Sequence, residues 1–197
     1  MLDHTEIRPR FPALGRGWIF FDNAGGSQIL GSAIERVVEF FTTSNVQLGG
    51  SYALSQLAAE RVAAGSRALA RWIHCDPSEV VLGSSTTQLL ANLSLAMAAQ
   101  HKPGAALLVP DVAHESNIGC WGRLQAARGV VVKEWKVDGD TLALELDDLA
   151  ALMTDKTRLV AFTHASNLVG SVHDVAAITR FVHERGARVC VDGVAYA

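Results

Sequence analysis

The sequence predicts an α/β protein of three layers, in which a mainly parallel sheet lies between two layers of helices. Short apolar runs alternate along the chain with longer stretches of helical period. Several of the short runs are almost wholly apolar, which is typical of strands buried on both faces. Strands and helices that alternate at this spacing favour helices on both sides of a parallel sheet. A chain of 197 residues is long enough to bury one substantial core.

The individual elements follow from the same patterns in chain order. Helical periodicity predicts helices at Gly31–Thr42, Leu54–Ile73, Thr87–Gln100, Asn117–Arg128, Leu146–Met153 and Val175–Arg185. Runs of β-branched and apolar residues predict strands at Trp18–Phe21, Glu79–Leu82, Ala105–Val109, Val130–Glu134, Leu159–Thr163 and Arg188–Val191. The turn signal Asp76-Pro77 separates the second helix from the strand that follows it.

Composition and charge exclude several classes of protein. The chain has 17 basic and 20 acidic side chains and no basic stripe, so we expect no nucleic-acid partner. No apolar run approaches the roughly 18–20 residues of a membrane span, and the N-terminus has no apolar signal core. Three widely spaced cysteines, Cys75, Cys120 and Cys190, form no metal-ligand spacing. We therefore expect a cytoplasmic protein with reduced thiols, no metal and no membrane contact.

Polar residues follow four of the predicted strands, at the point where each strand ends. In chain order they are Ser85, Thr86 and Thr87, then His114, then Asn167, and finally Asp192. Ligands of open α/β sheets bind in the crevice beyond the carboxyl ends of the strands. The sequence therefore predicts one site to which these strand ends contribute.

Each of these residues also has a purely structural interpretation. The run Ser85–Thr87 before a helix is either a helix cap or a phosphate cradle of backbone N–H groups and hydroxyls. His114 is either a loop histidine or a group that stacks on a planar ligand and transfers protons. Asn167 either stabilises its own turn or contacts the ligand. Asp192, at the end of a buried strand, either caps the next turn or pairs with a protonated ring nitrogen.

Six segments together resemble one known family. In chain order they are FFDNAGGSQ, NVQLGGSYALS, DPSEVVLGSSTTQ, HESNIGCW, THASNLVGSV and VDGVAYA. At these spacings the chain is similar to fold-type I pyridoxal-phosphate (PLP) enzymes of the class V aminotransferase group, and most similar to cysteine-desulfurase-like proteins. The resemblance extends from about Phe11 to the last residue and implies the large domain of that fold.

The resemblance also implies roles for the residues at the strand ends. The segment that matches Ser85–Thr87 holds the cofactor phosphate at a helix N-terminus, and the histidine that matches His114 stacks on the pyridine ring and moves protons. The asparagine that matches Asn167 lies beside the cofactor and orients the substrate. The aspartate that matches Asp192 pairs with the pyridine nitrogen, which keeps the ring an effective electron sink.

The N-terminal part of the resemblance implies contacts with the substrate and with a second subunit. The turn that contains Asn23 and Gly25 matches a stretch that lies near the substrate. The Gly49-Gly50 loop resembles one that reaches towards the site of a partner subunit, so we expect a homodimer in the complete protein.

Two departures from the family pattern limit these expectations. Ala195 stands where many relatives have a glutamine or histidine that bonds the cofactor's phenolic oxygen. The Schiff-base lysine of the family is expected beyond Asp192, and none of Lys102, Lys133, Lys136 and Lys156 matches it. We therefore expect an N-terminal fragment, with residues 1–30 as an N-terminal segment and residues 31–197 as a partial PLP-binding large domain that lacks its C-terminal part and the small domain.

The leading hypothesis for function is a PLP-dependent lyase or transferase that acts on an amino acid, similar to cysteine desulfurases. An alternative is a non-catalytic homologue, degenerate or split, that acts through a partner subunit. A third interpretation, a generic binding module for phosphate ligands, explains Ser85–Thr87 but not the residues at the other strand ends.

Overall fold

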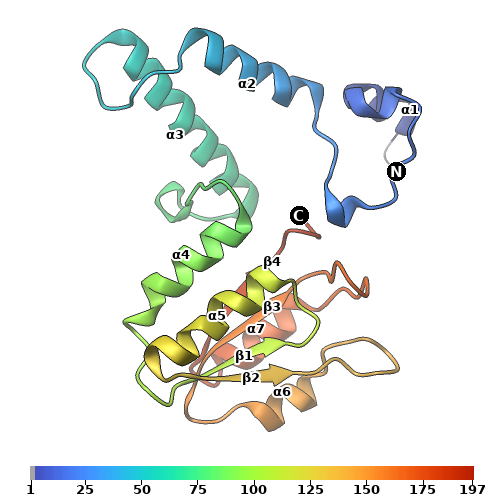
Figure 1. The fold of residues 1–197 in the computed structure, drawn as a ribbon, viewed down its shortest axis with the longest axis vertical. Coiled ribbons are helices and arrows are strands. Elements are labelled where there is room, and N and C mark those ends of the chain that lie inside the picture. The colour runs from blue at the N-terminus through green and yellow to red at the C-terminus, as the bar shows by residue number, and fades with distance from the viewer. Residues whose placement is uncertain (1–2) are drawn as a thin grey trace. The chain divides into compact units, whose positions relative to one another are not determined.

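The computed structural model describes residues 3–197 and divides the chain into two compact units, with the boundary between Leu82 and Gly83. The first unit is helical (Figure 1). Its elements are α1 (His4–Ile7), α2 (Gly31–Thr43) and α3 (Ala53–Ile73), with 3₁₀ turns at Arg8–Arg10, Pro12–Gly15, Asn23–Gly25 and Pro77–Glu79.

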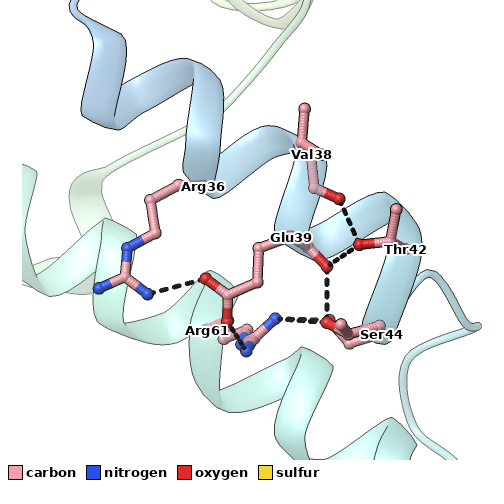
Figure 2. A network of polar contacts seen from close by, with 7 residues as sticks. Arg36, Val38, Glu39, Thr42, Ser44 and Arg61 are labelled. Carbon is pink, nitrogen blue, oxygen red and sulfur yellow. Dashed lines mark hydrogen bonds and ion pairs between the residues drawn. The ribbon is translucent and has the colours of Figure 1, made fainter.

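A polar network joins α2 to α3 in the first unit (Figure 2). The Glu39 carboxylate accepts hydrogen bonds from Arg36 at 3.0 Å and from Arg61 at 2.6 Å. Arg61 also donates to the hydroxyl of the buried Ser44 at 2.7 Å. Arg61 lies on α3, whereas Glu39 lies within α2 and Ser44 directly follows it, so this network ties α3 to the C-terminal part of α2.

The second unit contains a sheet of four strands in the order β2-β1-β3-β4, and every neighbouring pair is parallel. The strands are β1 (Ala106–Pro110), β2 (Val131–Trp135), β3 (Thr157–Thr163) and β4 (Arg188–Asp192). The helices are α4 (Thr86–Ala98), α5 (Glu115–Arg128), α6 (Leu146–Leu152) and α7 (Val175–His183). The predicted α/β class with a parallel sheet is therefore confirmed.

Each face of the sheet is covered by its own pair of helices. On one face, side chains of α4 and α5 such as Leu90 and Trp121 pack against Leu107 of β1 and Ala161 of β3. On the other face, α6 and α7 pack against alternate strand residues, among them Phe162. Successive strand residues point to opposite faces, so the apolar runs feed both clusters and form the three expected layers.

Two of the predicted strands are wrong. Neither Trp18–Phe21 nor Glu79–Leu82 is a strand in the described part of the chain. The exposed fraction is 72% for Trp18 and 74% for Val81, so these apolar runs are not buried in a sheet. A strand exists only through hydrogen bonds to a neighbour, and no strand among residues 3–197 pairs with either run.

The other predicted elements are present, with ends that differ by one or two residues. Within residues 3–197, no helix combines the length and the apolar character that crossing a membrane requires.

Candidate functional site

Asp192 is the last residue of β4 and lies next to Thr163, the last residue of β3. Its side chain points to the same face of the sheet as Cys190, because residues two apart in a strand share a face. Cys190 packs against the cluster formed by α4 and α5. Asp192 is 8% exposed, and its carboxylate accepts a hydrogen bond from the Val194 N–H at 3.0 Å.

The direction of α4 places its N-terminus at the same edge of the sheet as Asp192. Arg188, the first residue of β4, donates to the Gln100 side chain at 2.8 Å, just beyond the last turn of α4. The helix therefore ends at the amino edge of the sheet. A helix of 13 residues is about 20 Å long. Its first turn, with Ser85, consequently lies at the carboxyl edge on the face to which Asp192 points.

Ser85 is the N-cap of α4, and its hydroxyl accepts a hydrogen bond from the Gln88 N–H at 3.2 Å. The structural interpretation of this serine is thus confirmed. The N–H groups of Thr86 and Thr87 belong to the first helical turn, which has no acceptors within the helix. These N–H groups, the two threonine hydroxyls and the positive end of the helix dipole remain available to an anion.

His114 is the N-cap of α5 rather than an ordinary loop residue. Its Nδ1 accepts a hydrogen bond from the Ser116 N–H at 3.1 Å and lies 2.8 Å from the Ser116 hydroxyl. The helix starts at the carboxyl end of β1 and covers the same face as α4. His114, Ser85 and Asp192 are therefore brought to one edge and one face of the sheet.

Asn167 lies in the turn that follows β3 and is exposed. The hydroxyl of Ser166, not the side chain of Asn167, stabilises this turn by accepting from the N–H groups of Leu168 and Val169, each at 3.2 Å. The Ser166 carbonyl accepts from the Gly170 N–H at 3.0 Å. The side chain of Asn167 is thus not used by its own turn.

Asn23 and Gly25 belong to the first unit. They form a 3₁₀ turn in which the Asp22 carboxylate accepts from the Gly25 N–H at 3.0 Å. A Cβ atom at residue 25 would lie 2.5 Å from the carboxylate of Asp22. A larger residue at this position would therefore displace the Asp22 carboxylate.

Comparison with known proteins identifies the family. The model of the family described as "Aminotransferase class-V" matches residues 19–197. The chain belongs to the class V aminotransferase family. The predicted resemblance to this family and to cysteine-desulfurase-like proteins is confirmed.

Two curated relatives illustrate the similarity. The chain is 42% identical to the "Aminotransferase-like protein FGM3" of Gibberella zeae, over 98% of this chain and 49% of that protein. It is 33% identical to a cysteine desulfurase of Cronobacter sakazakii, over 95% of this chain and 48% of that protein. The chain spans about half the length of these curated relatives.

Solved structures show the same fold. A cysteine desulfurase from Thermococcus onnurineus superposes with a TM-score of 0.90 at 24% identity, over 98% of this chain and 48% of that chain. A C-DES variant with glycine covalently linked to its PLP cofactor superposes with a TM-score of 0.83 at 24% identity, over 96% of this chain and 50% of that chain.

Sequence reasoning missed two features of this class V aminotransferase chain. One is the hydrogen bond from the Ser116 N–H to the ring of His114. It was missed because Ser, Thr, Asp and Asn are the usual N-cap residues and histidine is not among them. The other is a stack of the His164 and Tyr196 rings, whose centroids lie 3.5 Å apart at 19°. The His164 N–H donates to the Asp192 carbonyl at 2.8 Å, which ties this stack to the end of β4. No sequence pattern pairs rings that are thirty-odd residues apart.

The cysteines of the second unit are structural rather than reactive. Burial raises the pKa of the Cys190 thiol to about 12 and that of the Cys120 thiol to about 11. Only the thiolate is an effective nucleophile, so neither side chain is activated near neutral pH. Among residues 3–197, no group of three or more His, Cys, Asp and Glu side chains is arranged to hold a metal ion.

Proposed function

We propose that this chain forms the PLP-binding part of a cysteine-desulfurase-like enzyme, a PLP-dependent lyase or transferase that acts on an amino acid. The observation that carries the proposal is the convergence of Ser85–Thr87, His114 and Asp192 at one edge and one face of the sheet. Family membership and the PLP cofactor of one structural neighbour support it. The division of the chain at residue 30, the homodimer and the cytoplasmic location belong to the same proposal.

The chemistry of these residues fits the parts of PLP. A phosphate needs N–H and O–H donors, and the first turn of α4 offers the free N–H groups and hydroxyls of Thr86 and Thr87. A protonated pyridine nitrogen needs a carboxylate. Within residues 3–197, the Asp192 carboxylate accepts only from the Val194 N–H, so further lone pairs are free. A flat ring between these groups needs a stacking partner, and the imidazole of His114 lies at the same edge.

When bound, PLP supplies an electron sink for carbanion chemistry at an amino acid. The residues of this chain then bind and orient it. The α4 N-terminus fixes the phosphate, and Asp192 keeps the ring nitrogen protonated because a charge-assisted hydrogen bond favours the charged form. We propose that Asn167 orients the substrate, since its side chain makes no hydrogen bond within its own turn. Asn23 and Gly25 of the first unit are proposed to contact the substrate as well.

The four lysines do not supply a covalent anchor in this arrangement. Lys133 donates to the Leu152 carbonyl at 3.1 Å. The backbone of Lys102 and Lys156 bonds to Ala105 and Ala106, at the amino edge of the sheet. Lys136 follows β2, the strand farthest from Asp192 in the sheet order. We therefore propose that this chain alone holds PLP without a covalent bond and does not turn over substrate.

Ala195 favours a second candidate, a non-catalytic or split homologue that acts through a partner subunit. Its methyl group is exposed and offers no hydrogen bond to the cofactor's phenolic oxygen. In this case PLP would bind weakly, and activity would appear only when a partner supplies the lysine.

Absorbance titration of the purified chain with PLP tests the proposal. We expect a saturable spectral change that pyridoxal, which lacks the phosphate, reproduces only at much higher concentration. After borohydride treatment and denaturation, the protein should retain no specific label. A chain that shows no saturable change with PLP would overturn the proposal, and one labelled at a single lysine would overturn the non-covalent mode of binding.

A further inference from the structure

We propose that Ser116 is a positioning residue that fixes His114 as the neutral tautomer with its hydrogen on Nε2. The ring then offers a hydrogen-bond donor, not a proton acceptor, to the group bound at the carboxyl edge of the sheet. The identity of that group as PLP rests on the proposed function. The cap, by which we mean the hydrogen bond from the Ser116 N–H to His114 Nδ1, does not depend on that function.

The backbone decides which nitrogen of His114 carries the hydrogen. The Ser116 N–H donates to Nδ1 at 3.1 Å, and an N–H group can only donate. A ring nitrogen that accepts must present its lone pair, so Nδ1 carries no hydrogen in this arrangement. The hydrogen of the neutral ring is consequently on Nε2.

The Ser116 hydroxyl also lies against Nδ1 of the His114 ring. Its Oγ lies 2.8 Å from Nδ1 and can donate to the same lone pair. Because Ser116 is buried, with an exposed fraction of 9%, its hydroxyl and N–H together leave Nδ1 little access to water. Nε2 is then the ring nitrogen that remains available to a ligand.

The first turn of α5 is held firmly enough to keep this geometry. The Asn117 N–H donates to the His114 carbonyl at 2.8 Å. The Asn117 side chain in turn accepts from Trp121 Nε1 at 3.2 Å, and neither of these two side chains is exposed. The first turn of α5 is therefore fixed, and rotation of the imidazole away from Ser116 would break the hydrogen bond between the Ser116 N–H and Nδ1.

The cap changes the expected role of this histidine. Nε2 already carries a hydrogen, and Nδ1 can take a proton only if its hydrogen bond with the Ser116 N–H is lost. In the capped state His114 stacks on the bound ring and donates from Nε2, and it does not remove a proton from the substrate. A proton acceptor for the reaction must come from another group.

Nuclear magnetic resonance of the ¹⁵N-histidine-labelled chain, without cofactor, tests the cap directly. Comparison with His114→Asn assigns the ring signals, since asparagine is a good N-cap and should preserve α5. We expect Nδ1 at the shift of an unprotonated nitrogen and Nε2 at that of a protonated one. The exposed His183 in the same spectrum gives the reference for an unconstrained ring. A hydrogen on Nδ1 of His114 would overturn the proposal.

Two substitutions of Ser116 separate the roles of its N–H and its hydroxyl. Ser116→Ala keeps the N–H and should keep the tautomer. Ser116→Pro removes the N–H within the first turn, where proline is tolerated, and should shift the ring signals of His114 towards those of His183. It should also weaken PLP binding about fivefold, the loss of one ordinary hydrogen bond.

These outcomes distinguish the cap from the proposed function. If the chain does not bind PLP but His114 has the expected tautomer, the proposed function fails and the cap stands. If Ser116→Pro changes neither the ring signals nor the PLP affinity, the cap fails while PLP binding stands.

Discussion

The Asp192→Asn substitution measures how much the pairing with a pyridinium contributes to the proposed site. Asparagine has nearly the same shape and still accepts the hydrogen bond that the Val194 N–H now makes to the carboxylate. The change therefore removes the charge of the side chain and little else. Because Asp192 is only 8% exposed, a hydrogen bond from its carboxylate to a cation would be weakly screened by solvent.

A hydrogen bond that involves a charged group contributes about 1.5–3 kcal/mol, and the dissociation constant of PLP should therefore rise roughly 10- to 150-fold. Absorbance titration at neutral pH measures this constant. The spectrum of the remaining complex should also shift towards that of an unprotonated ring. Asp174→Asn is the matched control, since Asp174 caps α7 by accepting from the Ala177 N–H, and asparagine is an equally good cap. If Asp192→Asn binds PLP as tightly as the unchanged chain, Asp192 does not pair with the ring nitrogen.

Three further predictions concern stability and reactivity. Phe162→Ala should lower the free energy of unfolding by about 3–5 kcal/mol in a urea titration, because this ring is fully buried, whereas Phe41→Ala, at 63% exposure, should change it by less than about 0.5 kcal/mol. Burial lowers the pKa of the His101 and His173 side chains below 6.5, so at mildly acidic pH the unfolded chain binds more protons than the folded chain. The melting temperature should therefore fall as the pH drops from 7.5 to 5.5. A melting temperature that is constant over this range contradicts the burial of both rings. Iodoacetamide at pH 8 should modify the half-buried Cys75 in the native chain and leave the two raised-pKa thiols unlabelled until urea is added, as mass spectrometry of the peptides would show.

The sheet of the second unit could be predicted because its strands carry their own signal. A run such as Leu107-Leu108-Val109 is buried on both faces, so every residue in it is apolar and no alternation is needed to recognise it. The same rule failed for Trp18–Phe21 and for Glu79–Leu82. Apolar composition indicates that a segment tends to be buried. A strand also needs a neighbouring strand to pair with, and the tertiary fold decides whether one is present.

The candidate site was predictable in its residues but not in its geometry. The positions of Asp192 and His114 follow from the place where each strand ends, which the sequence reveals. The hydrogen bond from the Ser116 N–H to His114 does not, because it depends on one side-chain rotamer at a helix start. The stack of His164 on Tyr196 is equally invisible, since it joins the turn after β3 to the turn after β4.

The carboxyl edge of this sheet suits an anionic ligand because positive helix ends lie there. The helix α5 follows β1 and runs back, so its positive N-terminal end lies at the carboxyl edge, where the N-terminus of α4 also lies. Two arginines lie at the opposite edge: Arg158 is the second residue of β3, and Arg188 is the first residue of β4. A phosphate beside Thr86 would therefore be held by backbone N–H groups and hydroxyls, not by these arginines. Such donors are fixed by the helix before the ligand arrives, so little side-chain freedom is lost on binding.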